Sequence, residues 1–159
     1  LQGATVAFIG DGNNVCNSLM IAAAMMGANT RIASPPGNEP TAAMLELARS
    51  KATNGAEIFV TNDPAEAVVG ADAVYTDVWA SMGQESEAAE RRQRFQPFQV
   101  NLELFGKAND DAIFMHCLPA HRGDEVTDEV ADHARSRIFD QAENRMHAFK
   151  ALLLYLTAN

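Results

Sequence analysis

The stretch of sequence that decides the fold is Thr5-Val6-Ala7-Phe8-Ile9-Gly10-Asp11-Gly12. Its first five residues are apolar or β-branched, which is typical of a short strand that is buried on both faces. The two glycines around Asp11 form a turn signal. Residues 15–26, which follow, have a helical composition and stop at Gly27, as helices commonly do. The chain is therefore predicted to begin with a strand, a tight turn and a helix.

The same alternation continues along the rest of the chain. Further strands are predicted at residues 30–33, 57–60, 73–76 and 112–116, with a short sixth strand at 137–139. Helices are predicted at residues 41–51, from Asp63 onward, and at 143–156. Short apolar strands that alternate with helices favour a parallel sheet with right-handed crossovers. The predicted fold class is α/β, a doubly wound (Rossmann-like) parallel sheet with helices on both faces.

Composition narrows the class of protein. The 159 residues match the size of one domain, and 47% hydrophobic with 21% charged residues is ordinary for a globular chain. A net charge of −9 argues against a nucleic-acid partner. No apolar run is long enough to cross a membrane, and no secretory leader is visible. Cys16 and Cys117 are far apart, which favours reduced thiols and a cytoplasmic location.

Ligands of doubly wound sheets bind beyond the carboxyl ends of the strands, which directs the search for a site. The first strand is followed by Gly10-Asp11-Gly12-Asn13-Asn14. A dinucleotide fingerprint needs a third glycine, but Val15 stands there, and strand two ends without an acidic residue. Nicotinamide cofactor binding is therefore disfavoured. The turn is either a simple capped turn or a place where Asn14 donates to a carboxylate.

A second candidate follows the fourth strand. Asp77 stands at the strand end, with Ser81 and Gly83 close behind it. A carboxylate there can hold an ammonium group by a charge-assisted hydrogen bond. The competing interpretation is a helix N-cap beside a buried Trp79. The polar residues 81–94 are expected to begin as a loop and to continue as a solvated helix, with Arg91, Arg92 and Arg94 on its exposed face.

The fifth strand ends in a third candidate, His116-Cys117-Leu118-Pro119. Cys117 is open to three interpretations: a nucleophile, a metal ligand beside His116 and His121, or a small buried hydrophobe. The metal signal is weak because no four-ligand spacing is present. The Leu118-Pro119 bond is predicted to be cis. Arg145 is predicted near the amino end of the last helix, where it suits a phosphate or carboxylate.

Four pieces occur in a fixed order along the chain: Gly10-Asp11-Gly12-Asn13-Asn14, Asp77-x-Trp79-x-Ser81-Met82-Gly83, His116-Cys117-Leu118-Pro119 and Ala142-Glu143-Asn144-Arg145. Together they resemble the carboxyl-terminal domain of the ornithine carbamoyltransferase family, and the resemblance covers residues 1–159. The family's other domain binds carbamoyl phosphate through a Ser-Thr-Arg-Thr-Arg loop and a His-Pro-x-Gln segment. Neither string occurs in these residues. We therefore expect the ornithine-binding half alone, inactive by itself.

The resemblance implies roles for the residues that match its motifs. Asn14 and the backbone N–H of Met82 would contact the α-carboxylate of L-ornithine, and Asp77 and Ser81 would hold its α-amino group. Family enzymes need no cofactor and no metal. They are usually trimers or multiples of trimers. The apolar residues 151–156 would pack against the carbamoyl phosphate domain.

The remaining implied roles concern the reacting end of the substrate. Cys117 and the Leu118 carbonyl would lie near the δ-amino group, with the cysteine orienting or accepting a proton rather than attacking covalently. His116 and Arg145 would reach carbamoyl phosphate. Three alternatives stay open: a nucleotide- or dinucleotide-binding Rossmann module, a non-catalytic amino-acid-binding domain, and a carbamoyltransferase for an analogue such as putrescine, which the α-amino-acid residues Asp77 and Ser81 disfavour.

Overall fold

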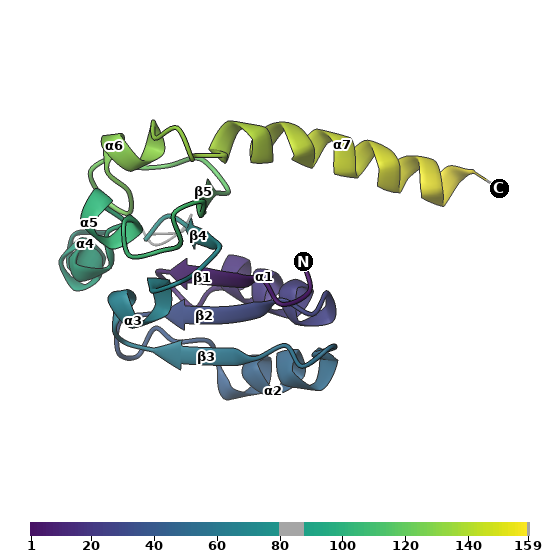
Figure 1. Cartoon of the computed structure of the whole chain (residues 1–159), viewed down its shortest axis with the longest axis horizontal. Coiled ribbons are helices and arrows are strands. Elements are labelled where there is room, and N and C mark those ends of the chain that lie inside the picture. Colours follow the sequence, from purple (N-terminus) through teal and green to yellow (C-terminus); the bar gives the residue numbers. More distant parts are fainter. Residues whose placement is uncertain (80–87, 159) are drawn as a thin grey trace.

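A computed structural model describes residues 1–79 and 88–158, so Ser81, Met82 and Gly83 lie outside the described residues. The described chain forms a sheet of parallel strands in the order β3-β2-β1-β4-β5 (Figure 1). The strands are β1 (Thr5–Ile9), β2 (Asn29–Ala33), β3 (Ile58–Thr61), β4 (Ala73–Thr76) and β5 (Ile113–His116). This order is that of a doubly wound sheet, and the predicted fold class is confirmed.

Helices connect the strands. They are α1 (Asn14–Met25), α2 (Ala42–Lys51), α3 (Pro64–Val68), α4 (Ala88–Phe95), the 3-10 turn η2 (Gln96–Phe98), α5 (Leu102–Phe105), α6 (Asp128–Ala131) and α7 (Ile138–Thr157). Asp63 caps α3 and Pro64 occupies its first turn, as predicted.

Each face of the sheet carries its own core, because successive strand residues point to opposite faces. On one face, Phe8, Ile32 and Tyr75 pack with Cys16 and Met20 of α1 and Ala48 of α2. The rings of Phe8 and Tyr75 are stacked across the β1–β4 pair, with centroids 5.9 Å apart. On the other face, alternate strand residues pack against α3, α5 and α6. The helices therefore cover both faces.

The sheet has one topological switch point. From β1 the chain runs through α1 to β2 on one side, whereas β4 pairs with the other side of β1. The connections leave the sheet in opposite directions at the carboxyl ends of β1 and β4. This is the place in an open α/β sheet where ligands bind.

The last helix differs from its prediction. No sixth strand forms at residues 137–139, and α7 begins at Ile138, well before the predicted start at Glu143. Only an isolated bridge joins Ser136 to Phe114 of β5. Arg137, at the N-cap position, makes no side-chain cap, so the sequence carries no start signal there. Phe139, whose aromatic ring favoured a strand, is 67% exposed on the helix.

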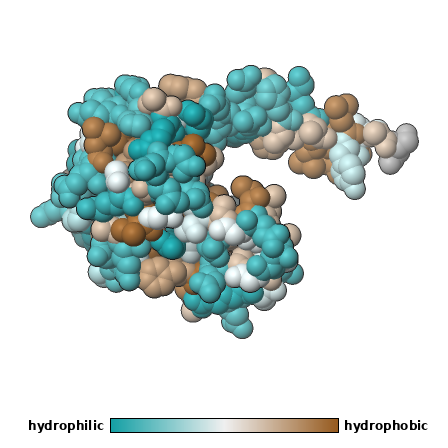
Figure 2. Space-filling model, in the orientation of Figure 1, coloured by the Kyte–Doolittle hydropathy of each residue, from teal (hydrophilic) through white to brown (hydrophobic). Residues whose placement is uncertain are grey.

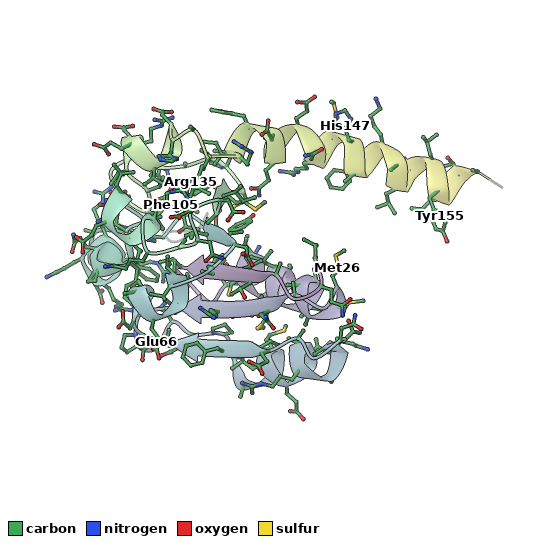
Figure 3. All side chains as sticks on the ribbon, in the orientation of Figure 1. Met26, Glu66, Phe105, Arg135, His147 and Tyr155 are labelled. Atoms are coloured by element: carbon green, nitrogen blue, oxygen red, sulfur yellow. The ribbon has the colours of Figure 1, made fainter. Side chains whose placement is uncertain are left out.

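Helix α7 extends far beyond the body of the molecule (Figure 1). It has 20 residues, which makes it about 30 Å long, yet only Ile138 is buried. Its outer half carries exposed apolar side chains, seen in brown in Figure 2, and Tyr155 lies near its far end (Figure 3). No helix of the described residues combines the length and the apolarity that a membrane crossing requires.

The segment before α7 is anchored to the sheet. The Arg135 guanidinium donates to the carbonyls of Asn109 (3.0 Å) and Ala112 (3.2 Å). It also lies over the Phe105 ring, 4.5 Å from the centroid (Figure 3). These contacts fix the base of α7, while its outer half, from Met146 onward, is exposed.

The expected solvated face of α4 is partly wrong. Arg92 and Arg94 are exposed, as predicted, but Arg91 is only 6% exposed. Its guanidinium pairs with Asp11, donates through Nε to the Trp79 carbonyl (2.6 Å) and lies over the Phe95 ring. Arg91 therefore joins α4 to the turn after β1 and to the chain after β4.

Candidate functional site

The ends of three strands meet at the carboxylate of Asp77, which follows β4. Asn13, in the turn after β1, donates its Nδ2 to Asp77 Oδ2 (3.3 Å). The thiol of Cys117, directly after β5, donates to Asp77 Oδ1 (2.9 Å). We call Asn13, Asp77 and Cys117 the strand-end cluster. It lies at the switch point, and Asp77 is 7% exposed. The structure thus brings together the three turns that the sequence singled out.

The two adjacent asparagines after β1, Asn13 and Asn14, have different roles. Asn13 is the N-cap of α1, and its Oδ1 accepts the backbone N–H groups of Val15 (3.0 Å) and Cys16 (3.4 Å). Asn14 is the first residue of the helix, and its side chain is exposed. Asn13, which sequence reasoning did not select, therefore holds Asp77, while Asn14 offers its amide to solvent.

The glycine turn after β1 does not form an anion cradle. The N–H of Gly10 donates to the Ala33 carbonyl (2.9 Å), and that of Gly12 donates to the Asn38 carbonyl (2.7 Å). A Cβ on Gly12 would lie 2.3 Å from the backbone nitrogen of Pro40, so the loop after β2 packs directly on this residue. Both amides are used inside the protein, which removes the main support for the dinucleotide alternative.

The thiol of Cys117 is held in its protonated form. Burial, followed by the hydrogen bond to Asp77 and by the negative charge of that carboxylate, raises the pKa of Cys117 to about 12. A reactive cysteine needs nearby cations that favour the thiolate, and here the neighbour is an anion. The site therefore supports a cysteine that orients a group by hydrogen bonding. It does not support a covalent nucleophile.

Alkylation of Cys117 tests this assignment. In a Cys16→Ala background at about pH 8, we expect iodoacetamide to react on the order of a thousandfold more slowly than with a free cysteine, because only the thiolate reacts. The rate should keep rising beyond about pH 10. Asp77→Asn removes a cause of the raised pKa and should speed the reaction. A rate that levels off near pH 9 would show an ordinary thiol.

The residues on either side of Cys117 are fixed by the backbone. His116 is fully buried at the end of β5, and its backbone N–H donates to Gln141 Oε1 of α7 (3.2 Å). Leu118 has a φ of 55°, and the Leu118-Pro119 bond is cis, as predicted. The imidazole is turned into the protein, so direct contact between His116 and carbamoyl phosphate is not supported by this geometry.

Arg145 does not lie at the start of the last helix. Because α7 begins at Ile138, Arg145 is in its third turn, beyond the reach of the helix dipole that the sequence argument used. Its side chain is exposed, and the guanidinium lies over the Phe149 ring, 5.8 Å from the centroid. Arg145 is thus available to a partner, but it is not part of the strand-end cluster.

Metal binding has no support in the described part of the chain, where no group of three or more His, Cys, Asp and Glu side chains could hold an ion.

Two further residues around the cluster were missed by sequence reasoning. Gln141 donates its Nε2 to Tyr75 Oη (2.8 Å) and joins α7 to β4, and Glu125 lies behind His116. The local sequence gives no signal for either, since each acts through a residue distant in the chain.

Comparison with known proteins gives a consistent picture. A family model described as "Aspartate/ornithine carbamoyltransferase, Asp/Orn binding domain" matches residues 2–156. The chain is 58% identical over 156 residues to ornithine carbamoyltransferase of Parasynechococcus marenigrum, covering 98% of this chain and 49% of that protein. It is 55% identical over 157 residues to that of Carboxydothermus hydrogenoformans, covering 98% and 50%.

Solved structures agree. The chain superimposes on ornithine carbamoyltransferase from Pyrococcus furiosus with a TM-score of 0.91 at 53% identity, covering 96% of this chain and 49% of that one. The anabolic enzyme from Campylobacter jejuni gives a TM-score of 0.91 at 43% identity, covering 96% and 51%. The chain spans about half the length of the curated relatives it matches. By its sheet order, its sequence and its structure, the chain belongs to the aspartate/ornithine carbamoyltransferase family, whose Asp/Orn-binding domain it matches.

Proposed function

We propose that this chain is the ornithine-binding half of an ornithine carbamoyltransferase. The observation that carries the proposal is the Asp77 carboxylate at the switch point, with the Cys117 thiol and the Asn13 amide both hydrogen-bonded to it. A carboxylate in this position suits an ammonium group, and a charge-assisted hydrogen bond is among the strongest a site can offer. The curated relatives are named ornithine carbamoyltransferase, and this name indicates ornithine as the molecule that carries the ammonium group.

In the proposed complex, Asp77 holds the α-amino group of L-ornithine, and the exposed amide of Asn14 donates to its α-carboxylate. Ser81 and the backbone N–H of Met82 assist at the two groups; both residues lie outside the described part of the chain. The side chain of ornithine then runs toward β5, where the Leu118 carbonyl accepts from the δ-amino group and Cys117 orients it. The proposed domain extends over residues 1–159.

The proposed reaction is carbamoyl transfer. The neutral δ-amine attacks the carbonyl carbon of carbamoyl phosphate, a tetrahedral oxyanion forms, and the C–O bond to phosphate breaks. The nitrogen loses a proton, and citrulline and phosphate are released, as in arginine biosynthesis. An alkylammonium group has a pKa of about 10.4, so the site must select the scarce neutral amine. Catalysis rests mainly on positioning, worth up to about 7–11 kcal/mol, and needs no cofactor.

The other participants follow from the same proposal. The family's carbamoyl phosphate domain supplies the cations that bind the second substrate, and the exposed Arg145 assists from α7. The apolar outer half of α7 packs against that domain. The assembled enzyme is a homotrimer or a multiple of one, in the cytoplasm, where both cysteines remain the free thiols that the structure has.

Titration of the purified 159-residue chain tests the proposal. We expect calorimetry to detect ornithine with a dissociation constant on the order of 1 mM, because half of the site is present. With ornithine and carbamoyl phosphate together, we expect no citrulline above the blank, since neither carbamoyl phosphate motif occurs in the chain.

NAD serves as the comparison ligand in the same titration. Binding of NAD in place of ornithine would favour the nucleotide alternative. Steady citrulline production by this chain alone would contradict the division of labour between the two halves.

A further inference from the structure

The turn that carries Cys117 and Leu118 contacts a carboxylate that lies away from the proposed substrate. Glu125 is 0% exposed, and its Oε1 accepts the backbone N–H of His121 (2.5 Å). The same oxygen lies 3.3 Å from Nε2 of His116. Residues 116–121 begin and end at these two contacts, so one carboxylate touches both ends of the turn, by a hydrogen bond at His121 and by a close contact without hydrogen-bond geometry at His116.

The imidazole of His116 passes this restraint to the middle of the turn. The N–H of Leu118 donates to His116 Nδ1 (2.9 Å), and a nitrogen that accepts a hydrogen bond carries no proton of its own. The ring proton of His116 therefore resides on Nε2, the nitrogen that lies 3.3 Å from Glu125 Oε1 without forming a hydrogen bond to it. The side chains of both residues are wholly buried, so their contact is not weakened by solvent.

The hydrogen bond to His116 restrains a residue whose backbone conformation is unfavourable. Leu118 has a φ of 55°, in the left-handed region that a residue with a branched side chain rarely adopts. Such a conformation persists when the surroundings determine it. The hydrogen bond from the Leu118 N–H to His116 Nδ1 restrains the backbone of Leu118 directly. It thereby helps to orient the Leu118 carbonyl and the Cys117 thiol.

Glu125 is itself firmly placed. Its backbone carbonyl accepts the N–H of Val100 (2.9 Å), and Val126 forms a bridge with Val100 in the buried core. The second oxygen, Oε2, lies 3.9 Å from Nδ1 of His121, whose side chain is 60% exposed. Glu125 thus joins the buried core around Val100, through its backbone, to the turn at residues 116–121, through its carboxylate.

We propose that Glu125 is a positioning residue: through His116 it aims the Leu118 carbonyl and the Cys117 thiol at the δ-amino group of the substrate, and so sets the preference for a diamino acid. The inference rests on the proposed function, since it names how that site recognises one end of its ligand. In this arrangement Glu125 and His116 touch no substrate atom. We expect their main effect at the δ-amino end, because Asp77 is also held by the Asn13 amide and by the Val78 N–H, and Asn14 lies on α1.

Two ligands separate this role from general stability. Norvaline has the α-groups of ornithine but lacks the δ-amine. In Glu125→Gln, which keeps the size of the side chain, we expect calorimetry to show that the ornithine preference over norvaline falls about tenfold while norvaline affinity stays unchanged. Asp124→Asn, the adjacent residue in an exposed pair with Arg92, is the matched control and should change neither affinity. Equal loss for both ligands, or no loss for either, would overturn the proposal.

A ligand-free measurement makes the test independent of the proposed function. In ¹⁵N NMR spectra, wild-type His116 should show its proton on Nε2, and Glu125→Gln should mix the two tautomers and speed hydrogen exchange of the Leu118 amide at least about tenfold. An unchanged tautomer and exchange rate would refute the positioning role. If the wild-type chain does not bind ornithine but Glu125→Gln still causes these NMR changes, the substrate assignment is wrong and the positioning of the turn by Glu125 stands.

A second variant covers the case in which Glu125→Gln does not fold. His116→Asn keeps an acceptor for the Leu118 N–H but removes the donor that faces Glu125. We expect it to lower the ornithine preference by a similar factor. A full preference in this variant would count against the coupling of Glu125 to the turn.

Discussion

Asp77→Asn will weaken ornithine binding by the 159-residue chain roughly 10- to 150-fold, the largest effect of any single change at the site. Hydrogen bonds to charged groups contribute about 1.5–3 kcal/mol, and the asparagine amide cannot replace the charge that faces the α-ammonium group. The variant also removes the acceptor of the Cys117 thiol. Calorimetric titration with ornithine, beside a thermal unfolding curve, measures the effect.

The residue before β4 provides the matched control. Asp72 lies at the amino end of β4, opposite the end that Asp77 follows, and it accepts from the Thr5 N–H (2.8 Å) and from Asn109 Nδ2 (2.7 Å). Asp72→Asn removes one negative charge and leaves the strand-end cluster intact, so ornithine affinity should stay within twofold of wild type, roughly the scatter of such measurements. If the two variants lost affinity equally, the effect of Asp77 would come from net charge or stability, and its assignment would be withdrawn.

Arg91→Met will lower the free energy of unfolding by about 3–5 kcal/mol, since removal of one partner of a buried ion pair leaves the other charge uncompensated. Methionine keeps the length and the apolar stem of the side chain. What is lost is the pair with Asp11, the hydrogen bond to the Trp79 carbonyl and the contact of the guanidinium with the Phe95 ring. Urea unfolding followed by the single tryptophan, Trp79, reports the change directly.

Arg92 is the natural control, one residue away on the same helix. Its side chain is 66% exposed and pairs with Asp124 at the surface, so Arg92→Met should change stability little. Arg91→Met combined with Asp11→Asn should recover part of the loss, because the stranded carboxylate is gone. A small effect of Arg91→Met alone would show that solvent reaches this pair.

The parts of the fold that could be predicted are those with a local cause. Thr5–Ile9 and Ala73–Thr76 form strands at the predicted residues because a strand covered on both faces needs a short continuous apolar run, and such a run is visible in one window of sequence. The site's location followed from the same step. Once the strands were placed, Asp77 and Cys117 had to emerge at neighbouring strand ends.

The failures have causes distant in the chain. Arg91 was assigned to a solvated face because it stands among other arginines, but its burial depends on Asp11, 80 residues away. Asn13 and Asn14 are equivalent by composition, and the N-cap goes to the one with an extended backbone. The start of α7 has no capping side chain, so an isoleucine and a phenylalanine at its first positions resembled a strand.

The anchoring of α7 at its first turn has a mechanical consequence. A rod about 30 Å long that pivots at its base moves its tip by roughly 2.6 Å for each 5° of tilt. Gln141, close to that pivot, is bonded to the His116 backbone and to the Tyr75 hydroxyl. A force on the distal end of α7 therefore acts on the end of β5 with the leverage of the whole helix, in part through the Gln141 amide.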